Sequence, residues 1–154
     1  MSIVIYTDGA CAGNNSDNMS LRRAGWAVVV VENDFATHQL SGMLTGTEIS
    51  NNRAELTALI KALEFIKVNQ ISDAKIIIDS EYALKGATEW LPGWINRNWK
   101  NANKKPVANR DLWEMINQLL NDVKSLNVSY EWTRGHNGNR YNELADQLAV
   151  AAYQ

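Results

Sequence analysis

The chain has 154 residues, a formal net charge of −2, and a composition that is 45% hydrophobic and 21% charged. These values are ordinary for a globular protein, and the length is sufficient for one domain, residues 1–154, with a core that needs no disulfides. No apolar run approaches the roughly 18 residues of a membrane span, which excludes an integral helical membrane protein, and we expect no membrane partner.

The N-terminal residues and the cysteine content bear on the cellular compartment. Residues 1–6 lack the basic and small-residue features of a secretory signal. Cys11 is the single cysteine, so an internal disulfide is impossible, as is common for proteins of a reducing compartment. We therefore expect a cytoplasmic protein.

The first half of the chain predicts three strands and a helix. Short β-prone runs at residues 3–7, 24–31 and 37–44 are joined by turns, which is typical of an antiparallel meander. A helix is expected over residues 52–68, because apolar side chains recur there at three- and four-residue steps. These side chains are Leu56, Leu59, Ile60, Leu63 and Ile66.

The second half alternates strands and helices. Residues 75–79 predict a strand without polar alternation, as expected for a strand covered on both faces. Further helices are expected from about residue 81, over 111–126 and over 142–152, with a strand at 128–132. This order predicts an α/β fold with a mixed sheet, in which the first, fourth and fifth strands are parallel.

Positive charge is concentrated between Trp90 and Trp113. Five basic residues and one acidic residue give this segment a net charge of +4 in a chain of net charge −2. Such a patch is typical of a surface that binds a polyanion. A solvated, lysine-rich loop would show the same charge, so the charge alone leaves both interpretations open.

Two strands end in an aspartate followed by a small residue. Asp8 stands at the end of the first strand and Asp79 at the end of the fourth. If these strands are parallel neighbours, both carboxylates lie at the carboxyl end of the sheet, where α/β proteins bind ligands. Alternatively, Asp8 belongs to a turn with Gly9, and Asp79 caps the helix that follows it.

Two further carboxylates lie on helices. Glu55 is four residues before Leu59, close to the buried stripe, and a carboxylate there needs a cation or hydrogen-bond donors. Glu55 could instead close a capping box with Asn52. Asp146 falls away from the apolar face of the last helix, and periodicity predicts that it is solvated.

The available ligand types favour a hard cation. The chain offers several carboxylates, one cysteine and two histidines, and oxygen ligands suit Mg²⁺ better than zinc. Two Mg²⁺ ions about 4 Å apart can activate a water and stabilise the leaving oxygen of a phosphodiester.

At this point a family resemblance becomes visible. Five segments, in this order, resemble the motifs of type 1 ribonuclease H: Thr7-Asp8-Gly9, Asn51-Asn52-Arg53-Ala54-Glu55, Ile78-Asp79-Ser80-Glu81-Tyr82, Gly135-His136-Asn137-Gly138-Asn139 and Asn142-Glu143-Leu144-Ala145-Asp146-Gln147-Leu148-Ala149. The segment from Trp90 to Trp113 resembles the basic protrusion of bacterial members. Each motif alone is weak, but five in order are specific.

The resemblance implies a ribonuclease H-like fold with a five-stranded mixed sheet flanked by helices. It implies an endonuclease that hydrolyses the RNA strand of RNA/DNA hybrids and leaves 5′-phosphate and 3′-hydroxyl ends. It implies two Mg²⁺ ions, with Mn²⁺ as an alternative, and a monomeric protein. The implied catalytic residues are the metal ligands Asp8, Glu55, Asp79 and Asp146, and His136, which would move protons or release product.

The resemblance also implies residues that bind the hybrid. Matches to minor-groove contacts are Asn14, Asn51, Asn52 and Glu81, and matches to a pocket for a DNA phosphate are Ser50, Arg53 and Asn109. Trp90, Lys100 and Lys104 belong to the basic segment, in which we expect Trp94 and Trp99 to pack as scaffold.

This chain departs from the family pattern at three places. Residues 15–23 replace a glycine- and proline-rich turn, Ser50 stands where threonine is common, and Glu81 stands where glutamine is frequent. Two alternative functions remain: a DNA-cutting relative with the same fold, and a catalytically weak module that binds hybrids. DNA-cutting relatives share the acidic cluster but lack a counterpart of the Asn51-Asn52-Arg53 signature that this chain carries. A weak binding module is expected where a catalytic carboxylate is replaced, and in this chain none is.

Overall fold

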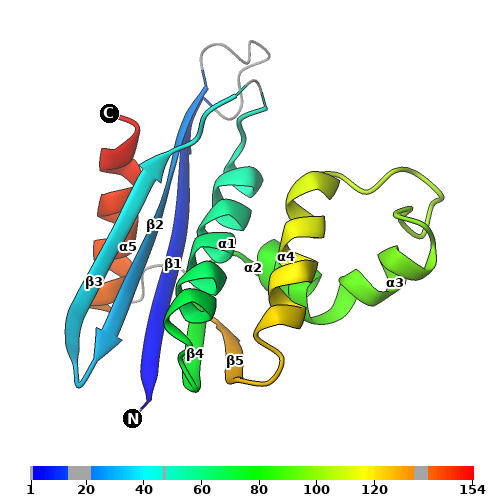
Figure 1. Cartoon of the computed structure of the whole chain (residues 1–154). Coiled ribbons are helices and arrows are strands. Elements are labelled where there is room, and N and C mark those ends of the chain that lie inside the picture. Colours follow the sequence, from blue (N-terminus) through cyan, green and yellow to red (C-terminus); the bar gives the residue numbers. More distant parts are fainter. Residues whose placement is uncertain (1, 14–21, 47, 134–138) are drawn as a thin grey trace.

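The computed structural model describes residues 2–13, 22–46, 48–133 and 139–154. Within these residues, five strands form one mixed sheet in the order β3-β2-β1-β4-β5 (Figure 1). The strands are β1 (Ile3–Ala12), β2 (Arg23–Glu32), β3 (Phe35–Met43), β4 (Asp73–Ile78) and β5 (Asn127–Trp132). The predicted five-stranded α/β architecture is confirmed.

Strand direction divides the sheet into two parts. β1, β2 and β3 are antiparallel neighbours, as the short turns between them predict. β4 pairs in parallel with β1 on one side and with β5 on the other. The predicted parallel set of first, fourth and fifth strands is therefore correct, and the carboxyl ends of all three face the same edge.

β1 is longer than its sequence predicts. The expected end at Asp8-Gly9 is wrong, because β2 continues to pair with β1 as far as Ala12, opposite Arg23. Gly9 lies within the strand and serves close packing rather than a turn. A Cβ atom at this position would lie 2.4 Å from the backbone nitrogen of Glu55.

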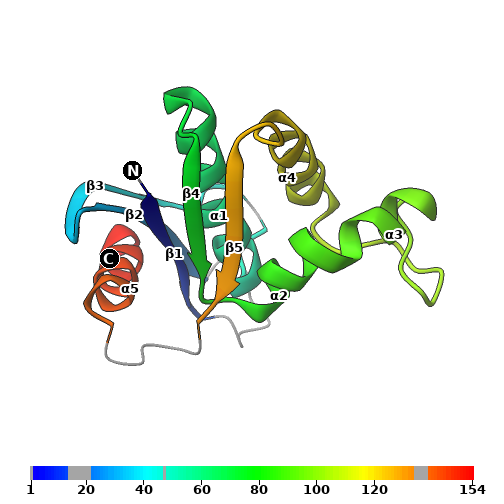
Figure 2. The same cartoon turned by 90° about the horizontal axis from the view of Figure 1, so that it is seen from below.

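Helices cover both faces of the sheet. They are α1 (Asn51–Asn69), α2 (Glu81–Lys85), the π-helical turn η2 (Gly86–Trp90), α3 (Leu91–Asn96), α4 (Arg110–Asp122) and α5 (Arg140–Ala152). Figures 1 and 2 show α1 and α5 on opposite faces, with α4 packed against α1. None of the described helices combines the length and the hydropathy that crossing a bilayer requires.

The larger core lies between the sheet and α1. The stripe predicted for this helix is buried throughout and meets the inward side chains of β1, β2 and β4. A smaller core lies beneath α5, formed by Ala27, Val29, Val31, Tyr141, Ala145 and Ala149. Fully buried leucines of α1, such as Leu56, Leu59 and Leu63, each contribute about 1.5–3 kcal/mol by burial, so α1 is firmly fixed against the sheet.

Candidate active site

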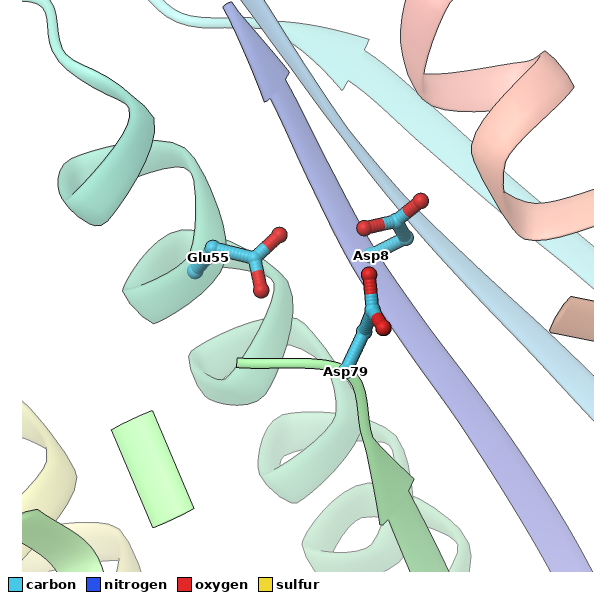
Figure 3. A group of neighbouring side chains, drawn as sticks. All are labelled: Asp8, Glu55 and Asp79. Carbon is cyan, nitrogen blue, oxygen red and sulfur yellow. The ribbon is translucent and has the colours of Figure 1, made fainter. Parts of the chain in front are cut away.

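Three carboxylates from three elements meet at the carboxyl edge of the parallel strands. Asp8 comes from β1, Glu55 from α1, and Asp79 from the end of β4 (Figure 3). Each residue contributes one carboxylate oxygen, and these three oxygens all lie within 4.8 Å of one another. Asp8 and Glu55 are buried, and Asp79 is half-buried.

The register of the sheet brings Asp8 and Asp79 together. The last parallel pair of β1 and β4 is Thr7 with Ile78, so the two aspartates are the next residues on neighbouring strands. The hydroxyl of Ser80, at 3.1 Å from the backbone nitrogen of Ala83, caps α2. The alternative in which Asp79 is the cap is therefore wrong.

Glu55 is held by β1. α1 begins at Asn51, with Ser50 as its N-cap, so Glu55 is not placed to close a capping box. The backbone N–H of Gly9 donates to Glu55 Oε1 and also approaches Asp8 Oδ1 at 2.9 Å. This contact fixes the Glu55 carboxylate beside Asp8.

Burial and mutual repulsion make this cluster electrostatically unfavourable without a cation. Burial raises the pKa of Asp8, and the negative charges of Glu55, Asp79 and Asp146 raise it further. Burial also raises the pKa of Glu55, and the hydrogen bond from Gly9 N–H partly offsets this rise. A bound divalent cation would relieve both the repulsion and the loss of hydration.

One oxygen of the cluster fits a cation particularly well. Asp8 Oδ2 is buried and finds no hydrogen-bond partner within the part of the chain that the structure describes. An unsatisfied buried carboxylate oxygen is rare unless it coordinates an ion or an ordered water. The candidate ligand atoms of Asp8, Glu55 and Asp79 are all carboxylate oxygens, which matches the ligand preference of Mg²⁺. The residues present therefore fit such an ion.

Asp146 lies near this cluster from the opposite layer. It is half-buried on α5, and its charge raises the pKa of both Asp8 and Glu55. The expectation of a solvated side chain is thus wrong. The helix periodicity missed it because Asp146 borders the buried positions Asn142, Ala145 and Ala149, whereas Leu144 and Leu148 are only partly buried.

The residues expected to hold a DNA phosphate also meet in space. Arg53 Nη1 lies 3.3 Å from Asn109 Oδ1, and the Ser50 hydroxyl accepts a hydrogen bond from Arg53 N at 3.1 Å. The Arg53 guanidinium forms two hydrogen bonds to Asp111, at 3.0 and 2.7 Å, which hold the pKa of Asp111 below its usual range. The pairing of Arg53 with Asp111 could not be predicted from local sequence, because the two residues are 58 positions apart.

The remaining expected substrate contacts lie around the same edge. Asn51 and Asn52 are exposed in the first turn of α1, and Glu81 is exposed at the start of α2. The carboxylate of Glu81 is 2.7 Å from Lys85 Nζ, so its charge is partly offset. Asn14 and His136 lie outside the described residues.

The basic segment is built on packed tryptophans. Trp113 is fully buried and Trp94 nearly so, and their rings meet edge to face at 5.3 Å. Trp99 is half-buried, and Trp90 remains 37% exposed. Lys100 and Lys104 are exposed in the loop between α3 and α4, which Asn101 closes through hydrogen bonds to the backbone of Asn103 and Lys105. The expected scaffold role of Trp94 is consistent with its burial.

Two hydrogen-bond contacts of the site region join residues that are far apart in the sequence. Trp132 at the end of β5 donates its indole N–H to the carbonyl of Asp79 at 3.1 Å. The Tyr82 hydroxyl receives hydrogen bonds from Asn109 and Trp113. Both partners are distant in sequence, so only the fold reveals these contacts.

Comparison with known proteins identifies the class. The family described as RNase H matches residues 1–154. The chain belongs to the RNase H family. The predicted resemblance of the chain to type 1 members is confirmed. It is an enzyme, an endonuclease of the hydrolase class.

Individual relatives support this assignment. The chain is 45% identical to a protein named Ribonuclease H from Cyanothece sp. over 96% of this chain and 86% of that one. It is similar to the crystal structure of LC9-RNase H1, a type 1 RNase H with the type 2 active-site motif, with a TM-score of 0.78, 28% identity, and coverage of 99% of this chain and 72% of that one.

A viral structure is similar as well. A foamy viral protease–reverse transcriptase, solved in complex with an RNA/DNA hybrid, matches with a TM-score of 0.80 and 26% identity. The match covers 97% of this chain and 20% of the viral chain, so it concerns one part of a longer protein.

Proposed function

We propose that this enzyme hydrolyses the RNA strand of RNA/DNA hybrids by two-metal-ion phosphodiester cleavage, with 5′-phosphate and 3′-hydroxyl products. The observation that carries the proposal is the convergence of Asp8, Glu55 and Asp79, with an unpartnered Asp8 oxygen among the described residues. The viral neighbour that was solved with an RNA/DNA hybrid supports the choice of substrate.

Asp8, Glu55, Asp79 and Asp146 are the proposed ligands of two Mg²⁺ ions, for which Mn²⁺ can substitute. When bound, the ions supply an activated water and stabilise the leaving oxygen. The chain supplies rigidity: Gly9 N–H orients Glu55, and the Trp132 indole holds the Asp79 carbonyl. Preorganised ligands of this kind lower the barrier because they need no rearrangement during the reaction.

His136 is proposed to move a proton or to assist product release, which suits a histidine near metals and a phosphate. Substituting His136 by Ala is then expected to slow turnover without ending it.

Substrate recognition is proposed to use three groups of residues. Asn14, Asn51, Asn52 and Glu81 contact the minor groove, in which the 2′-hydroxyl marks the RNA strand. Ser50, Arg53 and Asn109 hold a phosphate of the DNA strand, and Trp90, Lys100 and Lys104 contact the backbone. Because the phosphate pocket is separate from the carboxylates, a DNA-like path between them favours hybrids over double-stranded RNA.

The setting proposed for this activity is a cytoplasmic monomer with a single domain. Cys11 is a free thiol in the structure, in keeping with a reducing compartment.

The test compares three substrates of one sequence: an RNA/DNA hybrid labelled on the RNA, double-stranded RNA and double-stranded DNA. With Mg²⁺, we expect cleavage of the hybrid's RNA alone, and fragments whose 3′-hydroxyl ends a polymerase can extend. Cleavage of duplex DNA would instead indicate a DNA-cutting relative. Hybrid binding without cleavage, in Mg²⁺ and in Mn²⁺, would indicate a catalytically weak binding module.

A further inference from the structure

Asn109 has an unusual conformation at the start of α4. It is the N-cap residue, yet its backbone is left-handed, with φ 60° and ψ 31°, and its side chain does not cap the helix. An N-cap asparagine normally accepts a hydrogen bond from the first turn, and asparagine is one of the few residues other than glycine that adopt a left-handed backbone. The side chain of Asn109 therefore serves contacts other than the cap of α4.

The Asn109 amide is fixed from both sides instead. Arg53 Nη1 lies 3.3 Å from Asn109 Oδ1, and Asn109 Nδ2 lies 3.2 Å from the Tyr82 hydroxyl. A guanidinium can only donate, so the amide oxygen must face Arg53 and the amide nitrogen must face Tyr82. One of the two N–H groups of Nδ2 is used by Tyr82, which leaves the other to donate to an anion.

The Tyr82 hydroxyl is itself held in place. Trp113 Nε1 donates to the same oxygen at 3.0 Å, and the two rings meet edge to face at 5.7 Å. Trp113 is fully buried, so this donor cannot move away to water. The oxygen that receives the Asn109 N–H is therefore anchored to the core.

Tyr82 also connects the phosphate pocket to the carboxylate cluster. It lies in α2, three residues after Asp79, and Ser80 caps the helix between them. The path from Asp79 to the Asn109 amide thus runs through one short helix and one hydrogen bond. An enzyme that recognises a duplex by the spacing between a phosphate and the scissile bond needs such a rigid connection.

We propose that Tyr82 is a positioning residue, whose hydroxyl orients the Asn109 amide toward a phosphate of the DNA strand. This inference rests on the proposed function, since it assigns a phosphate to the pocket of Ser50, Arg53 and Asn109. A purely structural tyrosine would contribute to the packing around Trp113 and leave substrate affinity unchanged.

The first experiment measures the affinity of the full chain for an RNA/DNA hybrid without metal, together with KM and kcat in Mg²⁺. Tyr82→Phe keeps the ring and removes the hydroxyl, and one lost hydrogen bond corresponds to a roughly fivefold increase in Kd and KM with little change in kcat. Tyr130→Phe is the matched control, because it removes a half-buried tyrosine hydroxyl on β5. Its Kd and KM should equal those of the wild type.

A double-mutant cycle separates positioning from packing. In an Asn109→Ala background the Tyr82 hydroxyl has no amide to orient, so Tyr82→Phe should raise Kd no further. A scan of single neutral methylphosphonates along the DNA strand gives an independent readout. At the one linkage that weakens wild-type binding, Tyr82→Phe should cost no additional affinity.

Unchanged Kd and KM in Tyr82→Phe would overturn the inference. It would also be overturned if Tyr82→Phe raised Kd by the same factor in the Asn109→Ala background as in the wild type. The same holds if Tyr82→Phe still weakened binding to the hybrid with the neutral linkage. Because Kd is measured without metal, a wild-type protein that binds hybrids but does not cleave them would contradict the proposed activity and leave this inference testable by binding.

Discussion

The ionised form of the Asp8 carboxyl is strongly disfavoured in the folded protein when no cation is bound. Its pKa is raised by burial and by three neighbouring acids, so the folded state binds a proton more tightly than the unfolded chain does. The resulting stabilisation is present below the unfolded pKa of about 4 and is lost as the pH rises toward the folded value. The metal-free protein should therefore lose stability from about pH 4 upward.

Asp8→Asn removes this charge while preserving the shape of the side chain. We expect it to abolish cleavage and to raise the metal-free free energy of unfolding at pH 7 by about 1–3 kcal/mol. Urea unfolding in EDTA between pH 5 and 8 measures the effect, and Mg²⁺ should then stabilise the wild type more than the variant. If the wild type and Asp8→Asn were equally stable at pH 7 in EDTA, the ionised Asp8 carboxylate would not be disfavoured by its neighbours.

Glu81 places an additional negative charge two residues after Asp79 in the sequence, only partly offset by Lys85 at 2.7 Å. Removing that charge should favour a polyanion, so Glu81→Gln is expected to lower KM for the hybrid slightly. Glu64→Gln removes a partly exposed charge on α1 and serves as the control, with KM unchanged. A KM for Glu81→Gln that is equal to or above the wild-type value would contradict this expectation.

Among the elements, β1 and α1 are in unusually close contact at Gly9. A Cβ atom would lie 2.4 Å from Glu55 N and 2.5 Å from Ala54 C, both of them backbone atoms that cannot turn aside. Gly9→Ala should therefore destabilise the fold by about 1–3 kcal/mol and displace Glu55, lowering kcat.

Gly93→Ala in α3 is the matched control for this close contact. Its nearest neighbour would be the flexible guanidinium of Arg97 at 3.2 Å, so we expect stability and kcat near those of the wild type. Thermal unfolding and single-turnover cleavage of the two variants give both quantities. Equal effects at Gly9 and Gly93 would argue against a special role for the β1–α1 contact.

The loop between α3 and α4 presents Lys100 and Lys104 on a scaffold of buried tryptophans. If each lysine contacts one phosphate, each Lys→Gln substitution should reduce the slope of log Kd against log salt by about 1. Lys124→Gln, in the turn after α4, removes an equal charge and should leave the slope unchanged. A flat salt dependence of the wild type would contradict a role for this segment in binding.

Local pattern predicted α1 well and β1 poorly, for physical reasons. The α1 stripe is buried along one face, and burial of this kind is what periodicity reports. The end of β1 depends on pairing with Arg23–Trp26, and the small residues after Asp8 carry no local sign of that pairing. Likewise, Arg53 meets Asp111 across 58 residues, beyond any local signal.

At the scale of the whole molecule, the site exists only when both layers are assembled. Parallel pairing of β1 with β4 joins two aspartates, α1 adds Glu55 on one face, and α5 brings the charge of Asp146 from the other (Figures 1 and 3). Sequence reasoning reached the four carboxylates through ordered motifs, whereas the contacts that orient them, from Gly9 and Trp132, depend on the complete fold.

The most direct test of the central claim compares the wild type with Asp79→Asn on one RNA-labelled hybrid, in Mg²⁺ and in EDTA, with binding measured in the same samples. We predict that the wild type cleaves the RNA in Mg²⁺ alone, and that Asp79→Asn binds the hybrid with wild-type affinity but does not cleave it. Wild-type cleavage in EDTA, or an undiminished rate in Asp79→Asn, would contradict hydrolysis by a carboxylate-bound metal centre.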